Sequence, residues 1–154
     1  MFNQFKPIDI KWIKNVSSPT EDSYILVPSD NFQLYFPDIH ETNAGSPQEG
    51  EIILLFQKIG LKKVFTHLVS PTDNSQAKED KTREKHRFYR NVRIIAATPL
   101  HKIIEVSSTP WKEVNFQGIG MGNVCEIKNI NSVNDNNYDD LINDVWKRFT
   151  PFFR

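Results

Sequence analysis

Residues 51–71 read EIILLFQKIGLKKVFTHLVSP, and this stretch decides the fold of the chain. Residues 51–57 form an apolar run, and residues 63–69 are rich in the β-branched and aromatic side chains that strands favour. Gly60 lies between the two segments and marks a tight turn. The stretch therefore predicts a β-hairpin whose arms carry both apolar and hydrogen-bonding side chains.

Further strands are expected on both sides of this hairpin. Each shows an apolar run or an alternation of apolar and polar residues, and they cover residues 8–13, 24–27, 88–97 and 124–130. After the second of these, Ser29 or Asp30 is placed to cap a short helix or turn leading into Phe32, Leu34 and Tyr35. Residues 101–106 fit either a short strand or a helical turn. Polar or glycine-rich loops are expected at 38–50, 72–85 and 107–122.

The clearest helix lies near the C-terminal end. Its apolar residues recur at helical spacing and so share one face: Tyr138, Leu141, Ile142, Val145 and Phe149. Strands followed by this helix predict an α+β fold. We expect a small curved or closed, mostly antiparallel β-barrel with peripheral helices and a C-terminal amphipathic helix.

Composition limits the classes of function. At 154 residues the chain is expected to form a single domain, residues 1–154. Lysine plus arginine and aspartate plus glutamate number 19 each, and this balance argues against general binding of duplex phosphates. The single cysteine, Cys125, excludes an intramolecular disulfide and a four-cysteine zinc site. No segment has the ~20 apolar residues of a membrane helix, so we expect a cytoplasmic protein. No cofactor is expected.

Two segments carry a family resemblance. Residues 24–31, YILVPSDN, and residues 49–56, EGEIILLF, resemble the first strand and the turn-plus-strand of the PUA-like superfamily, most closely its EVE branch. Residues 63–69 and 90–97 would be later strands of the same barrel. The resemblance implies a small β-barrel that binds nucleic acid, in the EVE branch by reading modified bases. Residues 1–23 have no counterpart in this pattern and are treated as a candidate N-terminal extension.

The leading hypothesis is a non-catalytic domain that binds single-stranded nucleic acid or a modified base. A base needs an aromatic floor and hydrogen-bonding groups for its edge, and the candidate pocket residues are Tyr24, Asn31, Phe56, Gln57, Thr66, His67, Tyr89 and Trp111. Phosphate-binding candidates come from the basic window 78–93, which has aromatics among its cations: Arg83, Lys85, Arg87, Arg90 and Arg93. The alternatives are a packed core for the first set and a solvated loop for the second.

Two other functions are weighed against this one. The apolar tail with Phe152 and Phe153 would be an unusual exposed patch on a monomer, which favours a protein–protein interaction module. Asp38, Glu126 and Lys128 resemble parts of a metal-dependent nuclease motif, although the two halves lie far apart. The four histidines show no metal-ligand spacing, so no metal site is predicted.

Overall fold

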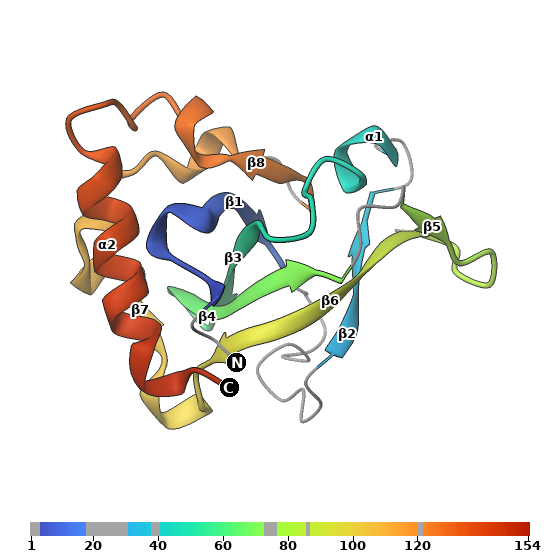
Figure 1. The fold of residues 1–154 in the computed structure, drawn as a ribbon, viewed down its shortest axis with the longest axis horizontal. Helices are drawn as coiled ribbons and strands as arrows, with labels where there is room; N and C mark the ends of the chain where they lie inside the picture. Colours follow the sequence, from blue (N-terminus) through green and yellow to red (C-terminus); the bar gives the residue numbers. More distant parts are fainter. Residues whose placement is uncertain (1–3, 18–30, 38–40, 73–76, 86, 120–121) are drawn as a thin grey trace.

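The computed structural model describes residues 4–17, 31–37, 41–72, 77–85, 87–119 and 122–154. These residues form one curled β-sheet with a helix packed against it (Figure 1). The strands are β1 Ile10–Asn15, β2 Asn31–Phe36, β3 Ile52–Ile59, β4 Lys62–Pro71, β5 Lys78–Glu79, β6 Phe88–Ala97, β7 Ile104–Glu105 and β8 Val124–Glu126. The α-helices are α1 Glu41–Ala44 and α2 Tyr138–Phe149, and short 3₁₀ turns connect several of the elements.

The predicted hairpin is confirmed and lies at the centre of the sheet. Strands β3 and β4 pair antiparallel, with Ile59 opposite Lys62 at the turn. Gly60 has a φ of 63°, a conformation that costs glycine little and other residues more. Strand β6, predicted at residues 88–97, has those bounds and pairs with β4 on the outer side of the hairpin.

The order of strands is β2-β6-β4-β3-β1-β8. Strand β1 pairs parallel with β3 and antiparallel with β8, so part of the segment treated as a candidate extension lies within the sheet. A parallel pair cannot be joined by a tight turn. The connection between β1 and β3 therefore includes β2 and α1, which lie elsewhere in the fold.

The sheet has a hydrophobic cluster on each face. The inner cluster combines Leu34 and Phe36 of β2 with Val124 of β8, although these two strands lie at opposite edges of the sheet. Helix α1 lies between those edges: the Asn43 side chain accepts a hydrogen bond from Val124 N and donates one to Val124 O, both at 2.8 Å. The sheet is therefore curled into a half-barrel, as expected for a small α+β fold of mostly β structure.

The outer cluster packs α2 against one end of the sheet. Leu141, Ile142, Val145 and Phe149 are buried there, which confirms the predicted helix and its apolar face. Trp111 lies beneath α2 and donates from its indole Nε1 to the carbonyl of Leu141 at 2.9 Å. The C-terminal tail continues onto the sheet, with Phe153 bridged to Ala96 of β6. Phe152 and Phe153 are half-buried against the cluster, so they do not form the exposed patch that the sequence suggested.

Some local predictions need correction. Residues 31–36 form a strand, because Phe32, Leu34 and Phe36 alternate with polar or half-exposed residues and face the inner cluster. The helix or turn expected to be capped at Ser29 or Asp30 begins outside the described residues. The loop expected at 72–85 contains the short strand β5. The strand expected at 124–130 ends at Glu126, and Ile127–Asn129 is a 3₁₀ turn. The strand expected at 24–27 lies outside the described residues.

Candidate functional site

One part of the outer sheet face is not covered by α2. Strands β2 and β6 pair without a register shift, so side chains opposite one another share a face. The cross-strand pairs on the outer face, each half-buried or exposed, are Tyr35 with Tyr89, Gln33 with Asn91, and Asn31 with Arg93. We call this surface the open face. It carries aromatic, amide and cationic groups in sequence along two adjacent strands.

A tilted pair of tyrosine rings occupies one end of the open face. The rings of Tyr35 and Tyr89 lie 5.6 Å apart, and the guanidinium of Arg83 lies 3.7 Å from the centre of the Tyr35 ring. The Tyr35 hydroxyl donates to Gln33 at 2.6 Å, which fixes the direction of its ring. Hydrogen bonds from Thr82, together with the Tyr35 hydroxyl and the charge of Arg83, lower the pKa of Asp80 below its usual value. The turn that carries Arg83 is thereby tied to the sheet.

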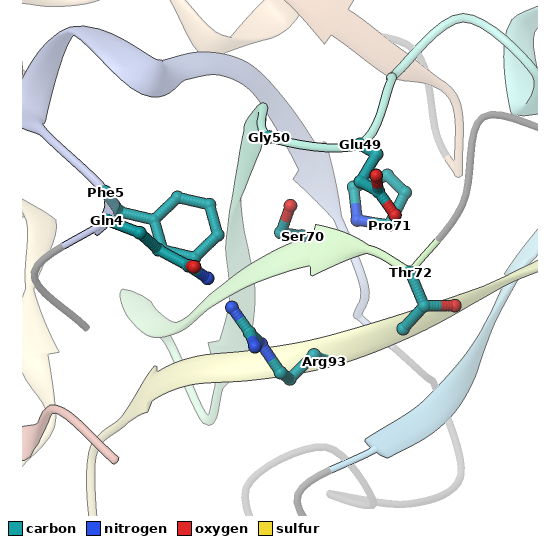
Figure 2. Close-up of a pocket in the computed structure, with 8 residues that line it drawn as sticks. All are labelled: Gln4, Phe5, Glu49, Gly50, Ser70, Pro71, Thr72 and Arg93. Carbon is teal, nitrogen blue, oxygen red and sulfur yellow. The ribbon is translucent and has the colours of Figure 1, made fainter. Parts of the chain in front are cut away.

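A hollow of about 510 Å³ lies at the other end of the open face (Figure 2). Arg93 of β6 points into it from below, with its guanidinium toward Gln4 and Phe5 (Figure 2). The remaining lining residues come from the loop before β3 and the end of β4: Glu49, Gly50, Ser70, Pro71 and Thr72. Four segments far apart in the sequence therefore meet around one cavity.

Arg93 is the main cation of this hollow. Its guanidinium lies 5.4 Å from the centre of the Phe5 ring, a distance that suits a cation–π contact. Within the described residues, no carboxylate lies within ion-pair distance of Arg93. Gly50 has a φ of 90° and open space beside it, so the chain turns sharply there and the mouth of the hollow stays clear. The arrangement leaves donors of Arg93 available to a ligand with acceptor groups.

The predicted pocket residues do not gather around one cavity. Gln57, Thr66 and His67 are brought together in the buried interior: Gln57 Nε2 donates to Thr66 Oγ1 at 3.2 Å, and His67 Nδ1 lies 2.9 Å from the same oxygen. Phe56 and Trp111 lie in the outer cluster beneath α2 and the 3₁₀ turns. Tyr89 and Asn31 lie on the open face, whereas Tyr24 lies outside the described residues. Of the seven that the structure describes, none lines the hollow at Arg93.

The predicted phosphate-binding residues are split between two faces. Arg90 points to the inside of the curl, is 2% exposed, and donates to the carbonyls of Ala44 at 3.1 Å and Pro47 at 2.6 Å. Arg93, three residues further along β6, points to the outside, because successive side chains of a strand alternate. Arg83 and Lys85 are exposed in the turn between β5 and β6, and Arg87 pairs with Glu79 at 3.8 Å. Arg90 therefore supports the fold and does not share a surface with the other cations.

Sequence reasoning overlooked several residues of this surface. Tyr35 had a usable signal, since residues 31–36 alternate between inward and outward side chains. Gln4, Phe5 and Glu49 carry no such signal, because only the fold brings them to Arg93.

Lys14 is a further residue that the sequence did not single out. It lies on β1 inside the curl and is 2% exposed, with its ammonium group donating to the carbonyl of Gly122 at 2.6 Å and lying 4.9 Å from the centre of the Phe36 ring. Burial disfavours the charged form and lowers the pKa of Lys14 to about 7. The amine therefore titrates near neutral pH.

The described residues offer no grouping for metal-dependent cleavage. They contain no cluster of three histidine, cysteine or acidic side chains that could hold a metal ion. Asp38 of the nuclease hypothesis lies outside them, and Lys128 is engaged over the ring of Tyr138 at 5.3 Å. Nothing in this part of the chain favours the nuclease alternative.

Comparisons with known proteins bear on the fold alone. No family model matches the chain, and no curated protein matches it significantly. The chain is similar in structure to a hypothetical protein from Leishmania major, with 12% sequence identity and a TM-score of 0.51, over 80% of this chain and 90% of that one. The two proteins thus share a fold of the small α+β class, built on a curled β-sheet.

No helix within the described ranges combines the length and the apolar character needed to cross a lipid bilayer.

Proposed function

We propose that this protein binds single-stranded nucleic acid across the open face of β2 and β6. The observation that carries the proposal is the combination of the Tyr35–Tyr89 ring pair with cations at both ends of the same face, Arg83 and Arg93. Bases of a single strand stack on tyrosine rings and on the plane of an arginine, while its phosphates pair with cations. Arg93 lies four positions after Tyr89, a span of about 13 Å along the strand. This length accommodates more than one nucleotide.

A single strand suits this surface better than a duplex does. Bases in a duplex are already stacked and would not reach the tyrosine rings. The chain is neutral overall, whereas general duplex binding depends on a clear excess of cations. The cations of the open face are few and local, so stacking must supply much of the affinity.

The PUA-like, EVE-related assignment belongs to the same proposal. It is supported by the curled sheet, by the confirmed hairpin at residues 51–71, and by the strand at residues 88–97. Under this assignment the domain is non-catalytic and reads bases. The protein–protein alternative was argued from an exposed aromatic tail, but this tail packs on the sheet.

Fluorescence anisotropy with a labelled oligothymidylate tests the proposal. We expect Tyr89→Leu to weaken binding about tenfold, since one base–aromatic stack contributes about 1–3 kcal/mol. Binding by the unmodified protein should weaken with added salt. Each phosphate contact contributes roughly −0.7 to the slope of the logarithm of the binding constant against the logarithm of the salt concentration. With two or three such contacts, we expect a slope of about −2. A duplex of the same length should bind more weakly than the single strand.

Tyr138→Leu is the matched control, because Tyr138 is a half-buried tyrosine at the start of α2, away from the open face. It should leave the affinity unchanged. Equal losses in the two variants, or no binding of any single strand at low salt, would refute the proposal.

A further inference from the structure

The hollow beside Arg93 has walls of opposite hydrogen-bonding character. Arg93 rises from β6 on one side, whereas Glu49 stands on the loop before β3 on another (Figure 2). A guanidinium offers only donors and a carboxylate only acceptors. Phe5 and Pro71 add apolar surface to the lining. A ligand that fits must present acceptors on one edge and donors on the other, with flat apolar faces between.

The hollow lies where the open face ends. The next outward residue of β6 beyond Arg93 is Ile95, which is fully buried in the outer cluster. The backbone nitrogen of Arg154 donates to the Ile95 carbonyl at 2.9 Å, so the tail covers the sheet there. A strand that stacks on Tyr35 and Tyr89 would therefore be blocked beyond Arg93, and the hollow is the adjacent space that could take a base.

We propose that the hollow binds a guanine base of the single strand, an inference that rests on the proposed function. Guanine presents the acceptors O6 and N7 on one edge, which match the paired donors of an arginine. Its N1–H and N2–H₂ groups on the other edge are donors that match the Glu49 carboxylate. Adenine places its N6 amino group where Arg93 requires an acceptor, so it fits less well. A volume of about 510 Å³ lies within the range of small-ligand sites.

The test uses oligothymidylates that carry one central guanine, adenine, cytosine, inosine or 7-deazaguanine, with binding measured by fluorescence anisotropy. We expect guanine to bind about tenfold more tightly than adenine or cytosine, as a bidentate arginine–guanine contact requires. Inosine lacks the N2 amino group and 7-deazaguanine lacks N7, so each should lose part of this preference in the unmodified protein. In Arg93→Lys, the oligonucleotide with 7-deazaguanine should bind as tightly as the one with guanine. In Glu49→Ala, the oligonucleotide with inosine should bind as tightly as the one with guanine.

Lys112→Gln and Glu113→Ala are matched controls, since both residues are exposed on the 3₁₀ turn Pro110–Glu113, outside the hollow. They should keep the full order of preference, and circular dichroism should show every variant to be folded. Equal affinity for all five oligonucleotides, or a preference for cytosine, overturns the guanine site while the proposed function stands. Failure to bind even plain oligothymidylate overturns both.

Discussion

Lys14 is a buried lysine whose protonation state depends on folding. Its amine is enclosed on β1 and its pKa in the folded protein falls to about 7, below the 10.5 of an exposed lysine. Between these two values the unfolded chain binds a proton that the folded chain does not, so the free energy of unfolding rises as the pH rises. Below about pH 7 both states hold the proton, and the full cost of burying the charge is present.

Replacing Lys14 should therefore stabilise the protein in a pH-dependent way. Lys14→Met removes the buried charge, and we expect its advantage in free energy of unfolding to be largest at and below pH 7. The advantage should shrink by roughly 1.4 kcal/mol for each pH unit above that value. Urea unfolding from pH 6 to pH 9 measures this. A constant difference between the two proteins across that range would show that Lys14 does not titrate near neutral pH.

Arg90 and Arg93 lie three residues apart and have separate tasks. Arg90 binds the carbonyls of Ala44 and Pro47 inside the curl, whereas Arg93 faces the hollow outside it. We expect Arg90→Met to lower the free energy of unfolding by about 2 kcal/mol, because it leaves buried carbonyls without this donor. Its affinity for a single strand should not change.

Arg93→Met should show the reverse pattern, with weaker binding and unchanged stability. Urea unfolding and anisotropy on both variants separate the two roles. If Arg90→Met weakened binding without loss of stability, the assignment of Arg90 to the fold would be wrong.

At the scale of elements, the local sequence pattern was enough to predict those strands and helices that local interactions determine. The apolar runs around Gly60, the segment 88–97 and the spacing of apolar residues in α2 each predicted an element that the structure contains. The parallel pairing of β1 with β3 could not be predicted, because it depends on a contact between distant segments. The burial of Lys14 and Arg90 could not be predicted either, since a charged residue in a strand pattern normally faces solvent.

The candidate site was the least predictable feature for the same reason. Arg93 and Tyr89 were identified because they lie in the basic window with its aromatics, and Asn31 because its amide offers both donors and acceptors. The residues that complete the surface, Tyr35 and Phe5, acquire their positions from strand pairing and from the N-terminal segment. The hairpin side chains Gln57, Thr66 and His67 were correctly expected to be close together, but they are buried.

The C-terminal tail is an element that stabilises the fold. Phe153 packs edge to face on Trp146 of α2, with ring centres 4.8 Å apart, and its backbone bridges to β6. We expect Phe153→Ala to lower the free energy of unfolding by about 1–2 kcal/mol, since the ring is half-buried and loses an aromatic pair. Urea unfolding followed by tryptophan fluorescence measures this. A variant as stable as the unmodified protein would mean that the tail does not hold α2 to the sheet.

At the scale of the whole molecule, the two faces of the curled sheet differ in how far they are covered. The inner cluster fills the curl, and α2 with the tail covers one end of the outer face. The open face of β2 and β6 stays uncovered, with the Tyr35–Tyr89 pair at one end and the hollow at the other. We propose that a nucleic acid strand lies along this surface.

Photochemical crosslinking with an oligothymidylate that carries 4-thiothymidine, followed by mass spectrometry of the attached peptides, tests this claim most directly. We predict attachment to peptides of β2 and β6, at or next to Tyr35 and Tyr89. Crosslinks confined to α2 or to the 3₁₀ turns of residues 106–118 would contradict the account.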